Sequence, residues 1–239
     1  MATSDLTQRR TAMLRSTVVL KAAMAVTGII MVLFLIAHMY GNLKIFEGQL
    51  AFDTYSASLR TIGEPILPHG GLLWILRVTL LASVLIHAAA AITLWARARK
   101  ATGGKGSRRY ESTAARRGVQ RTYASFTLRW GGIVIALFVI YHLLHLTVNV
   151  IAPGGSSDSP YVRTINGFEI WWVVLSYAVA LLALGFHLRH GMWAAFASLG
   201  MNRSPNVRRN LNILATLIAV VIIVGFLVPP ISVLFGWVS

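Results

Sequence analysis

The sequence has no cysteine among its 239 residues. The chain can therefore form neither a disulfide nor a thiolate-ligated iron–sulfur cluster, and it lacks the C-x-x-C-H pattern that attaches haem covalently. It also has no G-x-G-x-x-G or P-loop motif, so nucleotide or flavin chemistry would have to reside on another polypeptide. Any cofactor bound by this chain must be held by other side chains.

Charged residues are also scarce, at 12% of the chain, whereas 56% is hydrophobic and the mean hydropathy is +0.67. A bilayer core of ~30 Å needs about 20 apolar residues per helix. No cleavable signal peptide is expected, because the first apolar stretch has full spanning length and lacks a small-residue cleavage site. We predict an all-α integral membrane protein with five transmembrane helices, at approximately 18–40, 72–96, 130–150, 170–195 and 211–234.

The few acidic residues leave a net charge of +15, which in a soluble protein could indicate nucleic-acid binding. Here the 22 basic residues alternate by connection. Eighteen lie in the N-terminal segment, between Arg97 and Arg129, or from Arg189 to Arg209, and the other connections carry four of them with five of the seven acidic residues. The positive-inside rule then predicts a cytoplasmic N-terminus and an external C-terminus, with lipid rather than nucleic acid as the surrounding partner.

Ionisable residues inside a membrane are costly, so each one in a spanning segment is a functional candidate. Six of the seven histidines lie in the predicted spans, and His69 lies in an external loop. The six are His38, His87, His142, His145, His187 and His190.

Four of these histidines, one on each of the first four helices, fall at two depths. At a helical rise of ~1.5 Å per residue, His38 and His142 lie ~9 to 11 Å below the outer surface. His87 and His187 lie ~23 to 26 Å below it by the same count. Two histidines at one depth on different helices can ligate one haem iron from opposite faces. The spacing therefore predicts two non-covalent b-type haems ~14 Å apart, which would carry electrons across the bilayer.

Spacing leaves some alternatives open. His142 and His145 are three residues apart and share a helix face, so spacing cannot choose between them. His187 and His190 pose the same question, but His190 follows Arg189 near the cytoplasmic end, where bonding to a haem propionate or interfacial solvation suits it better, so His187 is preferred as the ligand.

Two glycines support the stacking. Gly28 and Gly132 each precede a histidine, His38 or His142, by ten residues, or ~15 Å of helix, which places them at the inner level. A missing side chain there would make room for a macrocycle, although glycine also serves close packing of membrane helices. Three cations are further candidates for propionate binding, and snorkelling to the headgroups is the alternative for each: Lys21, Arg77 and Arg129.

At these residues the sequence resembles the cytochrome b membrane-anchor subunit of succinate dehydrogenase and fumarate reductase, in its five-helix, dihaem form. The resemblance covers nearly the whole chain. It rests on Ile36-Ala-His38-Met-Tyr, on Leu85-Ile-His87-Ala, on Gly132 ten residues before His142-Leu, and on His187-Leu-Arg-His-Gly191-Met-Trp193 leading into Leu199-Gly200.

The resemblance implies one domain over residues 1–239, with His87 and His187 ligating the proximal haem and His38 and His142 the distal haem. It thereby selects His142 over His145. It also implies a bacterial plasma membrane, an iron–sulfur subunit and a succinate-converting flavoprotein as partners, and quinone, often menaquinone, as the redox substrate. The chain would be an electron-transfer subunit rather than the catalytic one. Gly185 stands where some fumarate reductases have a proton-transferring glutamate, so that proton path is not implied here.

Two other functions remain open on the sequence. The cytochrome b subunit of a membrane hydrogenase or formate dehydrogenase also places histidine pairs across a few helices, with a different spacing. A histidine-bearing transporter or proton channel would need no haem, but it would be expected to show broken helices or inverted repeats. The sequence has no internal repeat, and Pro229-Pro230 lies at the far end of the fifth predicted helix.

Overall fold

Every regular element that the structure describes is a helix. The structure is a computed structural model, and it describes residues 16–101 and 119–239. Five of its helices are long and apolar enough to cross a membrane, which confirms the expected number of spans. They are α2 (Thr17–Leu43), α4 (Gly71–Ala101), α5 (Val119–His142), α7 (Trp171–Ser198) and α8 (Pro205–Leu234). The basic residues before position 16 and between 102 and 118 lie outside the described residues.

The helices are longer than hydropathy predicts. The largest difference is in α5, which is helical from Val119 instead of position 130. Hydropathy marks only the part of a helix that lies in hydrocarbon, and arginine and lysine are good helix formers that continue it into the polar layer. At its other end α5 passes into a π-helical turn, η3 (Leu143–Thr147), which contains His145.

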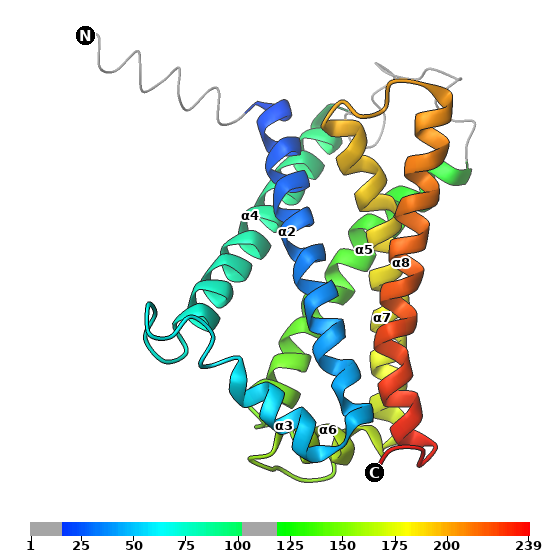
Figure 1. Cartoon of the computed structure of the whole chain (residues 1–239). Helices are drawn as coiled ribbons and strands as arrows, with labels where there is room; N and C mark the ends of the chain where they lie inside the picture. Colours follow the sequence, from blue (N-terminus) through cyan, green and yellow to red (C-terminus); the bar gives the residue numbers. More distant parts are fainter. Residues whose placement is uncertain (1–15, 102–118) are drawn as a thin grey trace.

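The five long helices run alternately up and down (Figure 1). Helix α2 lies centrally and packs against α4, α7 and α8, while α7 also packs against α5 and α8. Over the described residues, α4 packs mainly along α2, and α5 mainly along α7. The first four helices therefore lie in the order α4, α2, α7, α5, and α8 covers α2 and α7 from one side.

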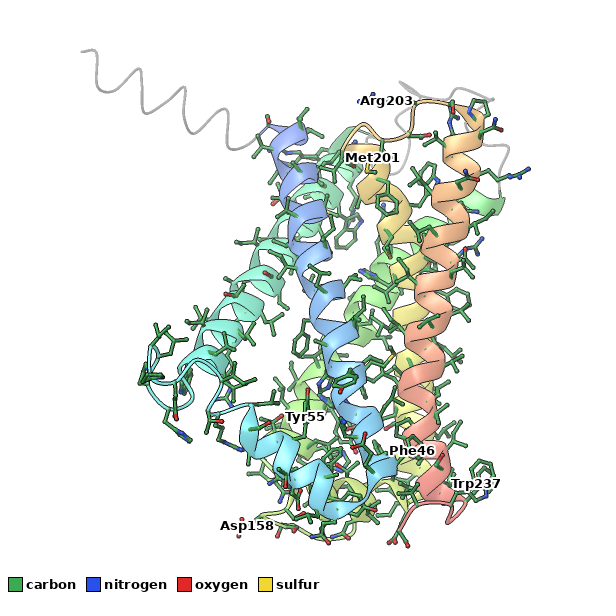
Figure 2. All side chains as sticks on the ribbon, viewed as in Figure 1. Phe46, Tyr55, Asp158, Met201, Arg203 and Trp237 are labelled. Carbon is green, nitrogen blue, oxygen red and sulfur yellow. The ribbon has the colours of Figure 1, made fainter. Side chains whose placement is uncertain are left out.

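The two ends of the bundle differ in their charged residues. We call the end where α2 and α8 begin the basic end, and Figure 2 shows Arg203 beyond it. The opposite, acidic end includes Asp158 in Figure 2 and the end of α8. Described cations at the basic end include Arg97, Arg99, Lys100, Arg203, Arg208 and Arg209, whereas the acidic end holds Glu47, Asp53, Glu64, Asp158 and Glu169 together with Lys44, Arg60 and Arg163. The alternation seen in the sequence is thus a difference between two faces of the folded chain.

Short helices, expected only as connecting loops, cover the acidic end. They are η1 (Lys44–Glu47), α3 (Gln49–Ser58) and α6 (Pro160–Phe168). Figure 1 shows α3 and α6 crossing the end of the bundle side by side, and the two pack together. Asp53 joins them, because its carboxylate accepts hydrogen bonds from the Ser159 hydroxyl at 2.6 Å and the Tyr161 backbone N–H at 3.0 Å.

Replacing Asp53 by alanine should loosen this cover. The variant loses an acceptor at the N-terminus of α6, where a carboxylate is favoured, and hydrogen bonds to charged groups are worth about 1.5–3 kcal/mol. We expect a lower midpoint of thermal unfolding in detergent. The matched control is Asp158→Ala, because the backbone carbonyl of Asp158 accepts the bond from Arg163. Equal midpoints for the two variants would show that Asp53 does not stabilise the cover.

Candidate functional site

The structure brings His38 on α2 against His142 on α5. Their ring centroids are 5.9 Å apart and the ring planes are nearly perpendicular, at 82°. Aromatic rings enclose His38, with Phe34 stacked at 5.3 Å and Phe226 of α8 at 5.6 Å. We call His38 and His142 the outer pair, after the level that the sequence assigns to them.

A second pair forms between α4 and α7. The rings of His87 and His187 have centroids 6.3 Å apart, with 54° between their planes. We call these two residues the inner pair. The structure thus pairs the same four histidines that the depth count pairs.

Both pairs link helices that do not pack closely with each other. The outer pair joins α2 to α5 and the inner pair joins α4 to α7, whereas the main helix contacts in the described chain are α4 with α2, α2 with α7, and α7 with α5. Two imidazoles on opposite sides of one metal atom, each bound at about 2 Å, have centroids roughly 6 Å apart. The separation of each pair is therefore that of two ligands sharing a metal atom.

Hydrogen bonds fix the orientation of His87. Its Nδ1 lies 3.1 Å from the Met24 carbonyl oxygen and 3.2 Å from the Thr27 hydroxyl oxygen. Thr27 donates its own hydroxyl proton to the Ala23 carbonyl at 2.7 Å, so Nδ1 of His87 carries the proton that both oxygens accept. The other ring nitrogen, Nε2, then has a free lone pair. Metal-ligating histidines usually have one nitrogen bonded in this way.

Glycines lie directly beside the inner pair. A Cβ on Gly28 would lie 3.6 Å from Cε1 of His87, and one on Gly132 would lie 3.5 Å from Cε1 of His187. The two glycines come from α2 and α5, the helices that do not supply the inner pair. The level inferred for them from the ten-residue spacing therefore agrees with their position in the fold.

Nδ1 of His187 is buried and has no hydrogen bond of good geometry. An unsatisfied buried donor or acceptor costs about 1–3 kcal/mol. The orientation of His187 is therefore held by packing to a greater extent than that of His87.

His145 occupies a different environment from His142. Its side chain is only 1% exposed, and Tyr141 stacks on its ring at a centroid distance of 5.5 Å. Nε2 of His145 faces Gly167 of α6 so closely that a Cβ on that glycine would overlap it. The π-helical turn directs His145 toward α6, while His142, the last α-helical residue of α5, lies against His38. Geometry thus separates two histidines that sequence spacing leaves equivalent.

The predicted propionate ligands lie at the edges of the bundle. His190 hydrogen-bonds through Nδ1 to the Thr127 hydroxyl at 2.8 Å, which places it between α7 and α5. Arg129 lies over the Trp95 ring of α4 at 5.6 Å. Lys21 is exposed on the first turns of α2.

Arg77, the fourth predicted propionate ligand, is exposed and lies over the Trp74 ring at 5.0 Å. This contact is the one expected of a snorkelling side chain at a membrane interface. Arg129, in contrast, contacts the helix that carries His87. Of the predicted cations, Arg129 is therefore the better placed for an acidic group near the inner pair.

Sequence reasoning missed one polar residue at the outer pair. The hydroxyl of Tyr177 on α7 lies 3.2 Å from Nδ1 of His142 and 3.0 Å from Nδ1 of His145. Tyr177 precedes His187 by ten residues, and the spacing that assigned Gly28 and Gly132 to the inner level would have assigned Tyr177 to the outer one. The ten-residue spacing to a histidine was therefore a usable signal for Tyr177, but it was considered only for glycines.

The residues present fit two bis-histidine haems. Each pair has the separation of two ligands on one metal atom, the free nitrogen of His87 is defined by its hydrogen bonds, and glycines border the inner pair. No group of three or more His, Cys, Asp or Glu side chains forms a metal site in residues 16–101 and 119–239. That the histidines bind iron stays a prediction.

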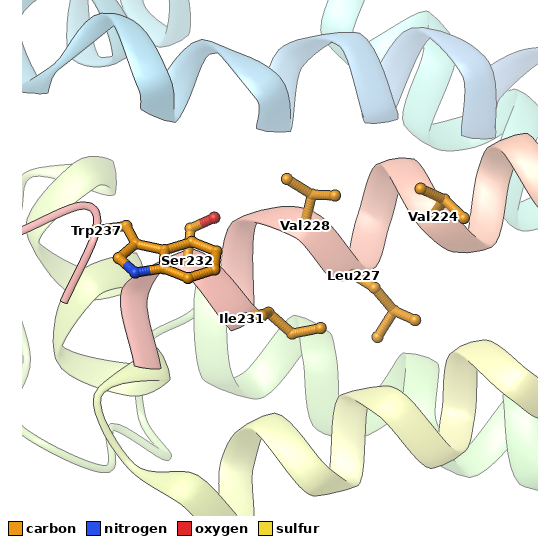
Figure 3. A pocket seen from close by; sticks show the side chains of 6 residues that line it. All are labelled: Val224, Leu227, Val228, Ile231, Ser232 and Trp237. Carbon is orange, nitrogen blue, oxygen red and sulfur yellow. The ribbon is translucent and has the colours of Figure 1, made fainter. Parts of the chain in front are cut away.

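A separate apolar groove runs along α8 (Figure 3) and includes no member of either pair. It is lined by Val224, Leu227, Val228, Ile231, Ser232 and Trp237. The adjacent Phe226 packs against His38, so the groove and the outer pair lie on different faces of the same helix turn.

Replacing Gly132 by leucine should affect the inner pair alone. A Cβ there already reaches van der Waals distance of the His187 ring, and the further carbons of leucine would displace the imidazole or the macrocycle. We expect the ratio of haem b to protein to fall by half. Leu137→Phe on the same helix is the matched control, because Leu137 is 64% exposed. An unchanged ratio of haem b to protein in Gly132→Leu would show that Gly132 does not border a haem site.

Comparison of the chain with models of protein families, with curated proteins and with solved structures finds no match. The chemistry of the two histidine pairs therefore has to be argued from their geometry and from the sequence motifs that carry them.

Proposed function

We propose that this chain is the dihaem membrane anchor of a bacterial succinate:quinone oxidoreductase. The observation that carries the proposal is the presence of two histidine pairs at two levels of one helix bundle, each with the separation of two axial ligands. The resemblance of the motifs around His38, His87, His142 and His187 to the membrane-anchor family supplies the choice of complex.

In this proposal the outer pair, His38 and His142, and the inner pair, His87 and His187, hold one b-type haem each through Nε2. Such haems, when bound, would supply single-electron transfer, and the paired histidines would hold them. The chain contributes rigidity to this transfer. His87 is fixed by Met24 and Thr27, and His38 by stacking on Phe34.

The basic end is proposed to face the cytoplasm and to receive the iron–sulfur subunit. The chain has no cysteine that could ligate an iron–sulfur cluster, so iron–sulfur and flavin chemistry would come from separate subunits. A cluster of like charges also speeds the association of an acidic partner. The inner pair lies nearer this end than the outer pair does, because His87 and His187 lie just past the midpoints of α4 and α7, which both end there, whereas His38 lies near the opposite end of α2.

Quinone, often menaquinone in the family, would be the redox partner within the membrane. Electrons from succinate would pass from the basic end through the inner and then the outer haem, or in the reverse direction during fumarate reduction. The complex would lie in the bacterial plasma membrane, with the C-terminus of this chain outside. Succinate chemistry itself would take place on the flavoprotein.

Alanine substitution of each membrane histidine tests the proposal. We expect two haems b per wild-type chain by spectroscopic haem assay. His38→Ala and His142→Ala should lose the same haem, and His87→Ala and His187→Ala the other, because a five-coordinate site binds haem b more weakly. The two losses should be distinguishable by redox titration.

His69→Ala is the matched control for these variants, because His69 is an exposed histidine near the acidic end that pairs with Glu64. It should retain both haems. A colourless wild-type chain would overturn the cytochrome assignment and favour a transporter or channel. Two haems without succinate:quinone activity in the purified complex would instead favour the cytochrome subunit of a hydrogenase or formate dehydrogenase.

A further inference from the structure

The Tyr177 hydroxyl is shared by two histidines of different character. It lies 3.2 Å from Nδ1 of His142, a member of the outer pair, and 3.0 Å from Nδ1 of His145, which belongs to neither pair. The Tyr177 ring is held in the buried cluster between α5, α6 and α7, with Phe138 at 4.8 Å and Phe168 at 4.9 Å. Because the ring is packed on both sides, the hydroxyl stays within hydrogen-bond distance of these two histidines.

The direction of these hydrogen bonds follows from the donors available. A tyrosine hydroxyl has one proton to donate and an oxygen that accepts. If Nε2 of His142 binds a metal, Nδ1 of His142 carries the proton, and it must donate to the Tyr177 oxygen. Tyr177 then donates its own proton to Nδ1 of His145, whose proton is on Nε2. This order gives the Tyr177 hydroxyl and Nδ1 of both histidines a hydrogen-bond partner and leaves Nε2 of His142 free, while Nε2 of His145 lies buried against Gly167 without a partner in the described chain.

We propose that Tyr177 is a positioning residue for the outer haem ligand and that His145 sets the direction of its hydrogen bond. The inference rests on the proposed function, since it concerns how His142 is prepared to bind haem. Nδ1–H of His142 donates to Tyr177, Tyr177 donates to His145, and this series of hydrogen bonds ends at His145.

Contacts with α6 hold His145 in place as the last acceptor of this hydrogen-bond series. Gly167 of α6 leaves room for its Nε2, where any larger residue would overlap it. Arg163, also on α6, donates to the Leu146 carbonyl at 3.1 Å and so holds the π-helical turn in which His145 lies. His145 is therefore locked by α6 in a position from which it can accept the Tyr177 proton.

The inner ligand is prepared differently, which allows the two haems to be distinguished. His87 donates to a backbone carbonyl and to Thr27, neither of which another histidine controls. An acceptor on Nδ1–H makes the imidazole a stronger donor to iron and favours the ferric state. Hydrogen bonds in a chain also strengthen one another, so the bond from Tyr177 to His145 makes the tyrosine oxygen a better acceptor.

Redox titration and electron paramagnetic resonance of the purified, haem-loaded chain test the proposal. In Tyr177→Phe we expect the reduction potential of the outer haem to rise and its low-spin ferric signal to shift, with the inner haem unchanged. In His145→Leu the outer haem should change in the same direction by less, although His145 is not a ligand. If Tyr177→Phe loses the outer haem, His145→Leu decides between the positioning role and a purely structural one.

Tyr141→Phe is the matched control, because Tyr141 lies in the same cluster and stacks on His145, but its hydroxyl makes no hydrogen bond to a histidine in the described chain. It should leave both haems as in the wild type. Thr27→Val should change the inner haem alone. Nitrogen-15 spectra of labelled histidine should also show the His145 proton on Nε2 in the wild type.

Outer-haem properties that are unchanged in Tyr177→Phe, or changed equally in Tyr141→Phe, would overturn the inference while leaving the proposed function intact. A His145 proton on Nδ1 would overturn it as well. A wild-type chain without haem would overturn both, and that outcome is seen before any variant is compared.

Discussion

A polar imidazole buried in an apolar helix bundle is costly unless the protein supplies partners for its nitrogens. The rest of this structure depends on how four such rings are placed. Each faces a second histidine across a pair of helices that do not pack together, and His87 and His142 use their remaining nitrogen in a hydrogen bond to a neighbouring helix. The helix order α4, α2, α7, α5 agrees with this pairing, because it separates the partners of each pair by one intervening helix.

The two histidine pairs are surrounded by different kinds of residue. The residues around the inner pair are small, with Gly28 and Gly132 against the imidazole rings, and a backbone carbonyl accepts the hydrogen bond from His87. At the outer level they are large and aromatic, with Phe34, Phe226 and Tyr177 around the pair and α3 and α6 above it. The outer pair is therefore the better enclosed by side chains, and its environment is the more easily altered by substitution.

Hydropathy and helical rise were sufficient to predict the five spans and the pairing of the four histidines, because both depend on regular geometry. The short helices α3 and α6 were not predicted, since their apolar residues form faces that only the rest of the acidic end covers. The π-helical turn at His145 could not be foreseen either. Arg163 of α6, distant in the sequence, bonds to the Leu146 carbonyl at the end of this turn, and local sequence does not reveal such a contact.

The central claim is that one iron atom lies between the members of each histidine pair. It is tested most directly by anomalous X-ray diffraction at the iron absorption edge from crystals of the purified protein. The account predicts two iron peaks, one between His38 and His142 and the other between His87 and His187. An absence of iron, or a peak at His145 or His190 in place of these sites, would contradict it.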